Sequence, residues 1–490
     1  MKLAAFSMAH NTTLLTGAAI AQKIISALFF FLVSWFIGTE QTAVYFNVFA
    51  AIAVFTVVAD FGLNNVLTRE AARDEVRAPR VFFQALLLKC IFGCVALGAL
   101  AVSRGILTYP NGSWGTIVLA GITLWFDSLR GLLYGYLRSY KNVRYEAIGV
   151  VGAQAFTTIV GTVFLLLHAP LMLLIGVFMV SSILQTAYAA WCVVFRALTP
   201  LRMIYDRELA MLMVREALPF AAAGIMAQLY AYQDAFIINH YLTPAAGGDW
   251  ARAYKFVYAF QFIPISLGAS IYPAISAAYE HERQKIVSII VYSYEYVLLL
   301  VLPLMTGIAL VTGPLFGRYF HKFVPSLPIL HLLVWSLGGG FLWYVNGAVL
   351  NGSRRQHIQT FCIASAFVTS VLINIYAVPR FGARGAAVAA VVSNTLLWVL
   401  SYCWITKFLT LPHTMLARRC ARIVGATLGM VLCVSGARLA GFHPLALVAS
   451  GVLAYGVGIW LFGAFSSEVR NMLCDKTSKL LVLCRITQRL

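Results

Sequence analysis

Charged residues are scarce in this chain of 490 residues: they make up 11% of it, and Asp and Glu together number only 17. Long polar connections are missing too, because no stretch between apolar runs exceeds about 25 residues. The sequence therefore excludes an inserted soluble domain of its own fold.

The motifs of nucleotide and metal chemistry are absent as well. The sequence has no Gly-x4-Gly-Lys-Ser/Thr loop, which excludes an ATP-driven pump that works by itself. No pair of histidines has the spacing of a zinc site within a loop. The nine cysteines lie mostly inside apolar runs, where they are typical of small buried residues. We therefore expect a transporter rather than an enzyme, without metal or cofactor.

Apolar runs dominate what is present. The chain is 61% hydrophobic with a mean hydropathy of +0.84, and its runs of about 20 residues are long enough to cross a bilayer. Because the runs are continuous rather than alternating, they predict helices and not a barrel. We also expect no cleavable signal peptide, since the first run is long enough to span the membrane. The predicted spans are 12–37, 42–67, 81–102, 114–137, 148–167, 171–195, 217–241, 250–278, 287–311, 327–350, 358–378, 386–408, 421–439 and 444–465.

The positive charge is a topology signal. The 36 Lys and Arg residues outnumber the 17 acidic residues, for a formal net charge of +19, and most of them lie at the two termini and in the even-numbered connections. This bias predicts that both termini are cytoplasmic, and it leaves no need for a nucleic-acid partner. Two basic segments, 196–216 and 466–490, are expected to lie along the cytoplasmic interface, the first as an amphipathic helix.

A weak internal repeat organises the spans. The stretches "GTEQTAVY" (38–45) and "GGDWARAY" (247–254) share a glycine, an acid and a tyrosine at equal spacing, and Gly131 with Arg138 matches Gly347 with Arg354 at a similar offset. A duplication of six spans would insert both halves in the same direction. We thus expect an all-α polytopic membrane protein of about 14 spans. Its predicted parts are a lobe at 1–195, a linker at 196–216, a second lobe at 217–409, two added helices at 410–465 and a basic tail at 466–490.

Ionisable residues inside spans are the candidate functional residues, because burying them unpaired is costly. Lys23 lies too deep in the first span to reach either interface, so it faces either a partner or a wet cavity. Asp234 lies well inside the seventh span. As a buried carboxylate it suits a proton carrier, and a salt bridge to Lys23 or Arg252 is the alternative.

Arg252 and Lys255 are three residues apart on one face of the eighth span, near its outer end. One interpretation is that both reach the interface. The sharper hypothesis is an anion site, with Arg252 as a bidentate fork for phosphate. Tyr254 and Tyr258 would add flat faces and hydroxyl groups suited to sugar rings.

The other buried charges suggest pairing or gating. Asp127 and Arg130 are three apart and are expected to neutralise each other, with a gating or coupling role as the alternative. Asp60, near the cytoplasmic end of its span, suggests a gate or a helix end. Lys89 and Glu295 have no predicted partner, although each is able to pair structurally.

Several segments together resemble a known family. They are "GTEQTAVY" (38–45), "ADFGLNNVLTREAARDE" (59–75), "YKNVRYEAIG" (140–149), "ALPFAAAGIMAQLYAYQDAFIIN" (217–239), "IYPAIS" (271–276) and "VPRFGARGAAVAAVVSN" (378–394). In combination they are similar to the bacterial polysaccharide-repeat (O-antigen and exopolysaccharide) flippases of the multidrug/oligosaccharidyl-lipid/polysaccharide exporter superfamily.

The resemblance implies a V-shaped molecule with two lobes and a cationic cleft lined by spans one, two, seven and eight, onto which Lys23, Asp234, Arg252 and Lys255 fall. It implies an undecaprenyl-diphosphate-linked glycan as substrate, alternating access in the bacterial inner membrane, and a polymerase and chain-length regulator as possible partners. The alternatives are a cation or drug antiporter of the same superfamily, a peptidoglycan-precursor flippase, and a membrane polymerase or ligase, for which the outer loops are short.

Overall fold

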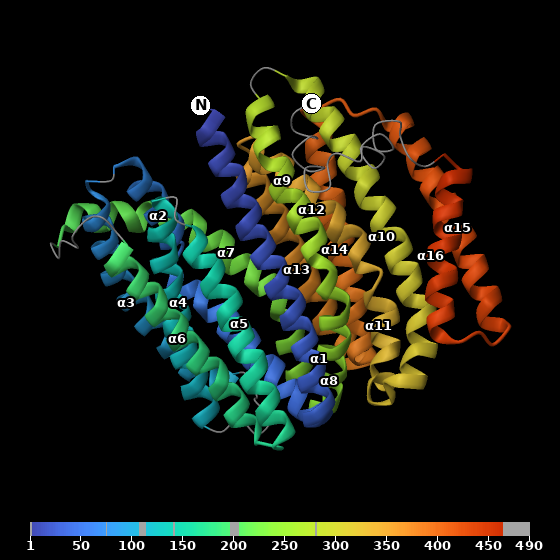
Figure 1. The fold of residues 1–490 in the computed structure, drawn as a ribbon, viewed down its shortest axis with the longest axis horizontal. Helices are drawn as coiled ribbons and strands as arrows, with labels where there is room; N and C mark the ends of the chain where they lie inside the picture. Colours follow the sequence, from blue (N-terminus) through green and yellow to red (C-terminus); the bar gives the residue numbers. More distant parts are fainter. Residues whose placement is uncertain are drawn as a thin grey trace. The chain divides into compact units, whose positions relative to one another are not determined.

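The computed structural model describes residues 2–74, 76–106, 114–140, 143–196, 205–279 and 282–463, with the side chains of 2–16, 104–106 and 196 left aside. Every regular element within these ranges is helical (Figure 1). The predicted basic tail, 466–490, lies outside the described residues, as does the part of the predicted linker at 197–204.

The helices follow the apolar runs. They are α1 (Lys2–Asp60), α2 (Leu63–Arg73), α3 (Ala78–Ile106), α4 (Trp114–Ser139), α5 (Val143–Leu166), α6 (Leu171–Arg196), α7 (Arg207–Tyr241), α8 (Pro244–Tyr258), α9 (Phe262–Ala278), α10 (Arg283–Tyr319), α11 (Leu327–Leu333), α12 (Ser336–Gly352), α13 (Gln356–Phe381), α14 (Ala383–Thr406), α15 (His413–Leu439) and α16 (Pro444–Leu461), with short 3₁₀ turns at Ala259–Gln261 and His321–Ser326. Among the described residues, 12 helices are long and apolar enough to cross a membrane, or up to 13 if a bent pair is one span. The protein is therefore a multi-pass membrane protein.

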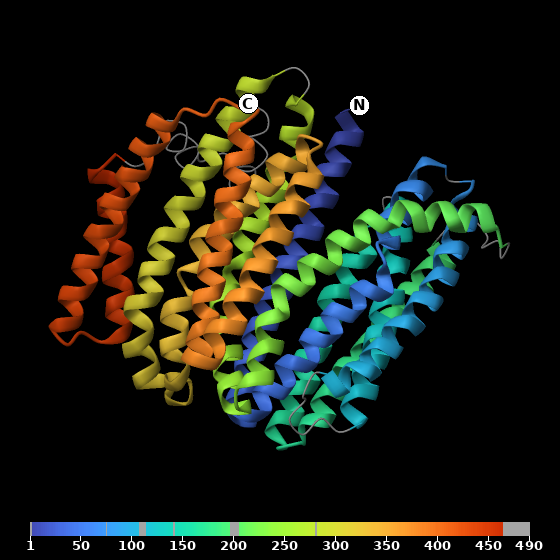
Figure 2. The ribbon, with the colours of Figure 1, turned by 180° about the vertical axis from the view of Figure 1, so that it is seen from behind.

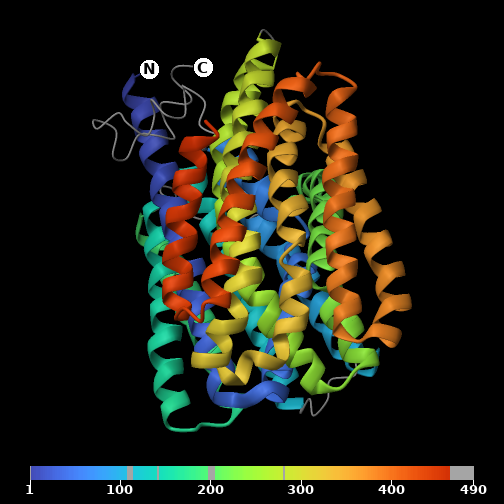
Figure 3. The ribbon, with the colours of Figure 1, turned by 90° about the vertical axis from the view of Figure 1, so that its right-hand side faces the viewer.

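The long helix α1 is in fact two arms. Its backbone leaves helical geometry at Gly38, where φ is 79° and ψ is 176°, a conformation that residues with a Cβ avoid. The rings of Phe30 and Phe46 lie 6.5 Å apart, whereas an unbroken helix would separate these residues by about 24 Å. The chain thus reverses at Gly38, as Figures 1 and 3 show, and the arms correspond to the first two predicted spans. The count of fourteen spans stays a prediction.

Several predicted boundaries are wrong. The second span ends at Asp60 instead of 67, because Phe61 and Gly62 have positive φ values of 46° and 72° that break the helix before α2. Residues 207–216, expected within a separate linker, form the first turns of α7, which Asp206 caps by accepting a hydrogen bond from the backbone N–H of Leu209. The span expected at 327–350 is broken, with a bend of 51° between its two halves.

The chain divides into two compact units, Met1–Lys255 and Phe256–Leu490. In the first unit α4 packs against α1, α3 and α6, and α7 packs against α1, α2 and α3. Because α7 joins this unit, the division into lobes at 196–216 stays a prediction.

The second unit has a comparable packing scheme. Its α12 packs against α9, α10 and α14, while α15 and α16 pack on each other and on α10 (Figures 1 and 2). A central helix flanked in the same way in both units, α4 and α12, is what a duplication would produce. The pair α15 and α16 has no counterpart among the described helices of the first unit, and its assignment as an addition to two six-helix lobes stays a prediction.

Candidate functional site

Arg252 binds the turn of α1 through several hydrogen bonds, an arrangement we call the clasp. Its side chain is 1% exposed, and its guanidinium donates hydrogen bonds to the Ser34 hydroxyl (2.7 Å), the Ser34 carbonyl (3.1 Å) and the Thr39 hydroxyl (2.8 Å). An Asp249 oxygen lies 3.6 Å from the same group. Ser34 and Thr39 flank the break at Gly38, so Arg252 connects α8 to both arms of α1.

Two features of α8 allow this contact. A Cβ on Gly248 would lie 1.9 Å from the Thr39 carbonyl oxygen, so only glycine lets α8 approach the turn this closely. The Tyr254 hydroxyl donates a hydrogen bond to the Ala231 carbonyl at 3.1 Å, which fixes α8 antiparallel to α7. The two copies of the glycine-acid-tyrosine repeat, 38–45 and 247–254, therefore lie against each other.

Lys255, one turn beyond Arg252, has a different environment. Its ammonium nitrogen lies 5.5 Å from the ring centroid of Phe30 and 5.7 Å from that of Phe46, over the ring faces. Lys23 lies seven residues before Phe30 on the first arm of α1, about two helical turns away and on the same face of that arm. Within the described ranges, neither ammonium forms an ion pair or a hydrogen bond with the protein. We call Lys23 and Lys255 the cation pair. The N–H groups of both are available as hydrogen-bond donors to a ligand.

The two predicted tyrosines are engaged in packing. Tyr254 also contacts Phe46 edge to face, with centroids 5.4 Å apart. The Tyr258 hydroxyl shares a hydrogen bond of 3.2 Å with Ser336 and lies 3.4 Å from the Asn394 amide nitrogen, both in the second unit. The contacts of Tyr258 favour a structural role, and its assignment to the substrate site stays a prediction.

The remaining predicted charges are paired. Lys89, which is 2% exposed, lies 2.7 Å from Asp60 and also donates a hydrogen bond to the Ser128 carbonyl. Asp127 and Arg130 lie 2.8 Å apart, as the interpretation of mutual neutralisation predicted.

Glu295, 2% exposed in α10, pairs with Arg419 of α15. This ion pair joins α15 to α10 within the second unit. Two of the three pairs join different helices, α3 to α1 and α15 to α10, whereas Asp127 and Arg130 lie one turn apart on α4. The coupling or gating roles of Asp60, Asp127, Arg130 and Glu295 stay predictions.

Asp234 is buried in α7 with 7% exposure. Its neighbour Gln233 is also buried, and both amide atoms of Gln233 have no hydrogen-bond partner among the described residues. The ion-coupling role of Asp234 stays a prediction.

The sequence did not single out Ser34, Thr39, Phe30 or Phe46. The signal that existed was the repeat, whose first glycine marks the turn and whose second copy lies against it. Which hydroxyl groups and rings would meet Arg252 and Lys255 depended on the rotation of the two α1 arms, and span-level reasoning does not give that rotation.

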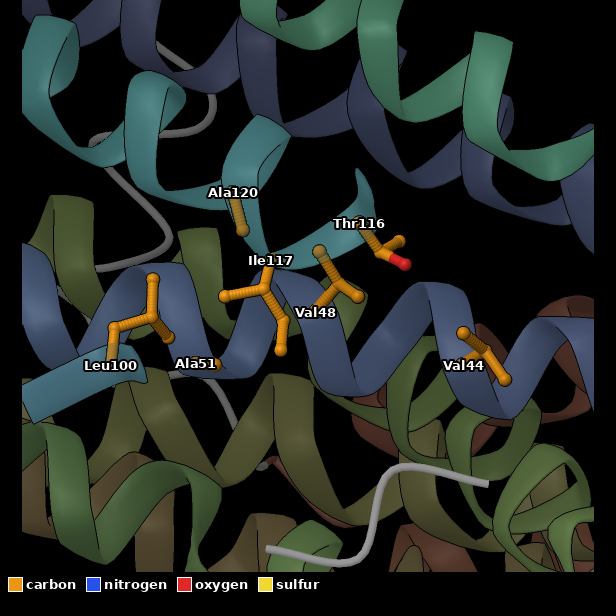
Figure 4. A pocket seen from close by; sticks show the side chains of 7 residues that line it. All are labelled: Val44, Val48, Ala51, Leu100, Thr116, Ile117 and Ala120. Carbon is orange, nitrogen blue, oxygen red and sulfur yellow. The ribbon is translucent and has the colours of Figure 1, made fainter. Parts of the chain in front are cut away.

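One small hollow among the described residues lies elsewhere in the first unit. Val44, Val48 and Ala51 of α1, Leu100 of α3, and Thr116, Ile117 and Ala120 of α4 line it, as Figure 4 shows. Six of these seven residues are apolar, and no charged side chain faces it. It is a packing gap between helices, and it has no chemistry for recognising a charged substrate.

Comparisons with known proteins address the fold and family. A family model described as "Polysaccharide biosynthesis protein" matches residues 8–279. The chain is 23% identical over 487 residues to the probable flippase AglR of Haloferax volcanii, covering 96% of this chain and 99% of AglR. It is 22% identical to the probable low-salt glycan biosynthesis flippase Agl15 of the same organism, over 76% of this chain and 78% of Agl15.

Two further matches are more limited, one in coverage and the other in sequence identity. An uncharacterized membrane protein of Methanocaldococcus jannaschii, MJ1068, is 24% identical, and the chain spans only 48% of its length. The structure of the lipid II flippase MurJ in an inward closed conformation superposes with a TM-score of 0.74 at 13% identity, over 92% of this chain and 98% of MurJ. At that identity the likeness to MurJ shows a shared fold.

Proposed function

We infer the function from one premise: the chain belongs to the polysaccharide biosynthesis protein family. We propose that it translocates undecaprenyl-diphosphate-linked oligosaccharide repeat units across the bacterial cytoplasmic membrane, for O-antigen, capsule or exopolysaccharide synthesis. The flippases AglR and Agl15, which the chain matches over most of its length, support a lipid-linked glycan as the substrate class.

The observation that carries the proposal is the unpaired cation pair of Lys23 and Lys255. Lys255 is half-buried and Lys23 is exposed on the protein surface, and both lie on membrane helices, where an ammonium group without a counter-ion is costly unless an anion arrives. A diphosphate offers two linked anionic groups, and the ammonium N–H donors form charge-assisted hydrogen bonds with phosphate oxygens. Arg252 is left out of this headgroup site, because its guanidinium is bound to Ser34 and Thr39.

The proposed mechanism is alternating access. The diphosphate and glycan enter from the cytoplasmic side while the lipid tail stays in the bilayer, and the headgroup leaves on the outer side. Downhill entry of an ion through Asp234 would reset the protein. Both termini would then be cytoplasmic, and a polymerase with its chain-length regulator would receive the product.

The main competing function, export of cationic drugs, fits the site poorly. A pocket for organic cations needs carboxylates, whereas the two charges that carry this proposed site, Lys23 and Lys255, are positive. A polymerase or ligase is disfavoured by the family and by the flippase relatives.

The test is complementation of a strain that lacks the gene, with lipid-linked glycan quantified in extracted lipids. The null strain should accumulate one complete, unpolymerised repeat unit. Wild type and Lys407→Gln should relieve this, while Lys23→Gln and Lys255→Gln should not. Lys407 is the matched control because it is an exposed lysine that also lies over a ring, 3.9 Å from the centroid of Trp404. Normal levels of lipid-linked glycan together with lost drug tolerance would instead identify an antiporter.

A further inference from the structure

The setting of Lys255 shows how a cation can be held in this protein without being neutralised. We propose that Phe30 and Phe46 are positioning residues: their ring faces hold the Lys255 ammonium in place and leave its N–H groups available to an anionic headgroup. The inference rests on the proposed function, because it assigns how that same site is prepared for a diphosphate.

The geometry is that of a two-sided cation–π site. Both nitrogen-to-centroid distances, 5.5 Å to Phe30 and 5.7 Å to Phe46, lie within the range of about 6 Å over which a ring face attracts a cation. The interplanar angle of 72° between the two rings gives the ammonium two differently oriented faces.

The rings themselves are fixed by packing. Phe30 and Phe46 are each 3% exposed. Phe46 is in turn packed edge to face against Tyr254, with centroids 5.4 Å apart, and tilted against Tyr232 at 6.3 Å. A ring held on several sides in this way cannot turn its face away from the ammonium.

A second lysine in the same unit shows the alternative. The ammonium of Lys89 is bound by the Asp60 carboxylate and the Ser128 carbonyl, so its charge is neutralised and two of its three N–H donors are occupied. A ring face attracts an ammonium through its quadrupole but offers no lone pair. Phe30 and Phe46 therefore lower the cost of holding Lys255 charged beside Lys23 and leave its donors unoccupied.

The site depends on the reversal of α1. Phe30 belongs to the first arm and Phe46 to the second, and the two meet only because the chain turns at Gly38. Lys255 reaches the rings from α8, which Arg252 fixes to the same turn. The clasp around Arg252 and the ring pair around Lys255 thus have separate tasks: the first builds the site, and the second presents the charge.

The experiment replaces the phenylalanine at position 46, and separately at position 30, with mono-, di- and trifluorinated phenylalanine in the full-length protein. Fluorination weakens the negative face of the ring while nearly keeping its size, so a role in packing alone would not respond to it. The readout is the Kd of undecaprenyl diphosphate in detergent. Each added fluorine should weaken binding by a regular step, on the order of tenfold in total at position 46.

Phe49 is the matched control, because it lies on the same arm and packs on aromatic rings, 4.7 Å from Tyr45 and 4.4 Å from Phe178. Fluorination there should leave the Kd unchanged. An equal response at Phe49 would overturn the inference. A tighter Kd along the series would do so as well, because it would mean that the rings compete with the headgroup for Lys255.

Lys255→Gln separates the inference from the function on which it rests. If fluorination has no effect while Lys255→Gln weakens binding, the ring pair is only packing and the headgroup site stands. If Lys255→Gln has no effect either, the proposed headgroup site fails and the inference fails with it.

Discussion

Removing the guanidinium of Arg252 is expected to destabilise the protein rather than to remove a substrate contact. Arg252→Gln deletes three hydrogen bonds to Ser34 and Thr39. Interhelical hydrogen bonds in membrane proteins average about 0.6 kcal/mol and reach about 1.7 kcal/mol. Three of them predict a loss of about 2–5 kcal/mol in the free energy of unfolding. Asp249 would also lose the guanidinium that lies 3.6 Å from its carboxylate.

The assay is titration of the purified protein from dodecyl maltoside into SDS, with the free energy of unfolding taken from the transition. Lys255→Gln is the matched variant, because it removes a cation of the same helix that forms no ion pair or hydrogen bond with the described residues. We expect it to stay within about 1 kcal/mol of wild type while losing affinity for undecaprenyl diphosphate. Ser34→Ala removes one acceptor of the clasp and should fall between the two.

The opposite pattern would refute the structural role of Arg252. If Arg252→Gln unfolds at the same SDS fraction as wild type and yet fails to bind undecaprenyl diphosphate, the guanidinium contacts the ligand. If Arg252→Gln does not fold at all, Ser34→Ala still provides the test, since it must lose stability without losing affinity.

Two further predictions follow from close contacts in the first unit. Gly248→Ala places a Cβ 1.9 Å from the Thr39 carbonyl oxygen and should lower the free energy of unfolding by about 1–3 kcal/mol. Gly152→Ala is the control and should not destabilise the protein, because a Cβ there would have no atom within 4 Å. Equal effects of the two variants in an SDS titration would contradict the close approach of α8 to the turn. Lys89→Met leaves Asp60 without its buried partner and should cost about 3–5 kcal/mol, and adding Asp60→Asn should recover most of this; a double variant that is worse than either single one would show that the two residues are not coupled.

Much of the helical plan was readable from the sequence because it depends on local properties. An apolar run long enough to cross the bilayer forms a helix wherever it is placed, since no other conformation satisfies its backbone in lipid. Most of the predicted spans therefore appear close to their predicted bounds. The errors fall where a helix continues past the apolar run, as at 207–216 in α7, or breaks inside it, as after Asp60.

The pairing of charges was only partly readable. Asp127 and Arg130 could be matched because they lie one turn apart on a single helix. Lys89 with Asp60, and Glu295 with Arg419, could not be matched, because each pair joins different helices and depends on how those helices are rotated about their axes.

Arg252 and Lys255 show which properties of the site the sequence determines and which depend on the tertiary structure. The sequence by itself determined that two cations lie three residues apart near one end of a membrane helix, and it suggested a single role for both. Only the tertiary structure decided that Arg252 is bound by the turn of α1 while Lys255 lies between two ring faces with free donors. The physical reason is that a side chain's role depends on the partners brought to it. Those partners come from α1, more than two hundred residues earlier in the chain.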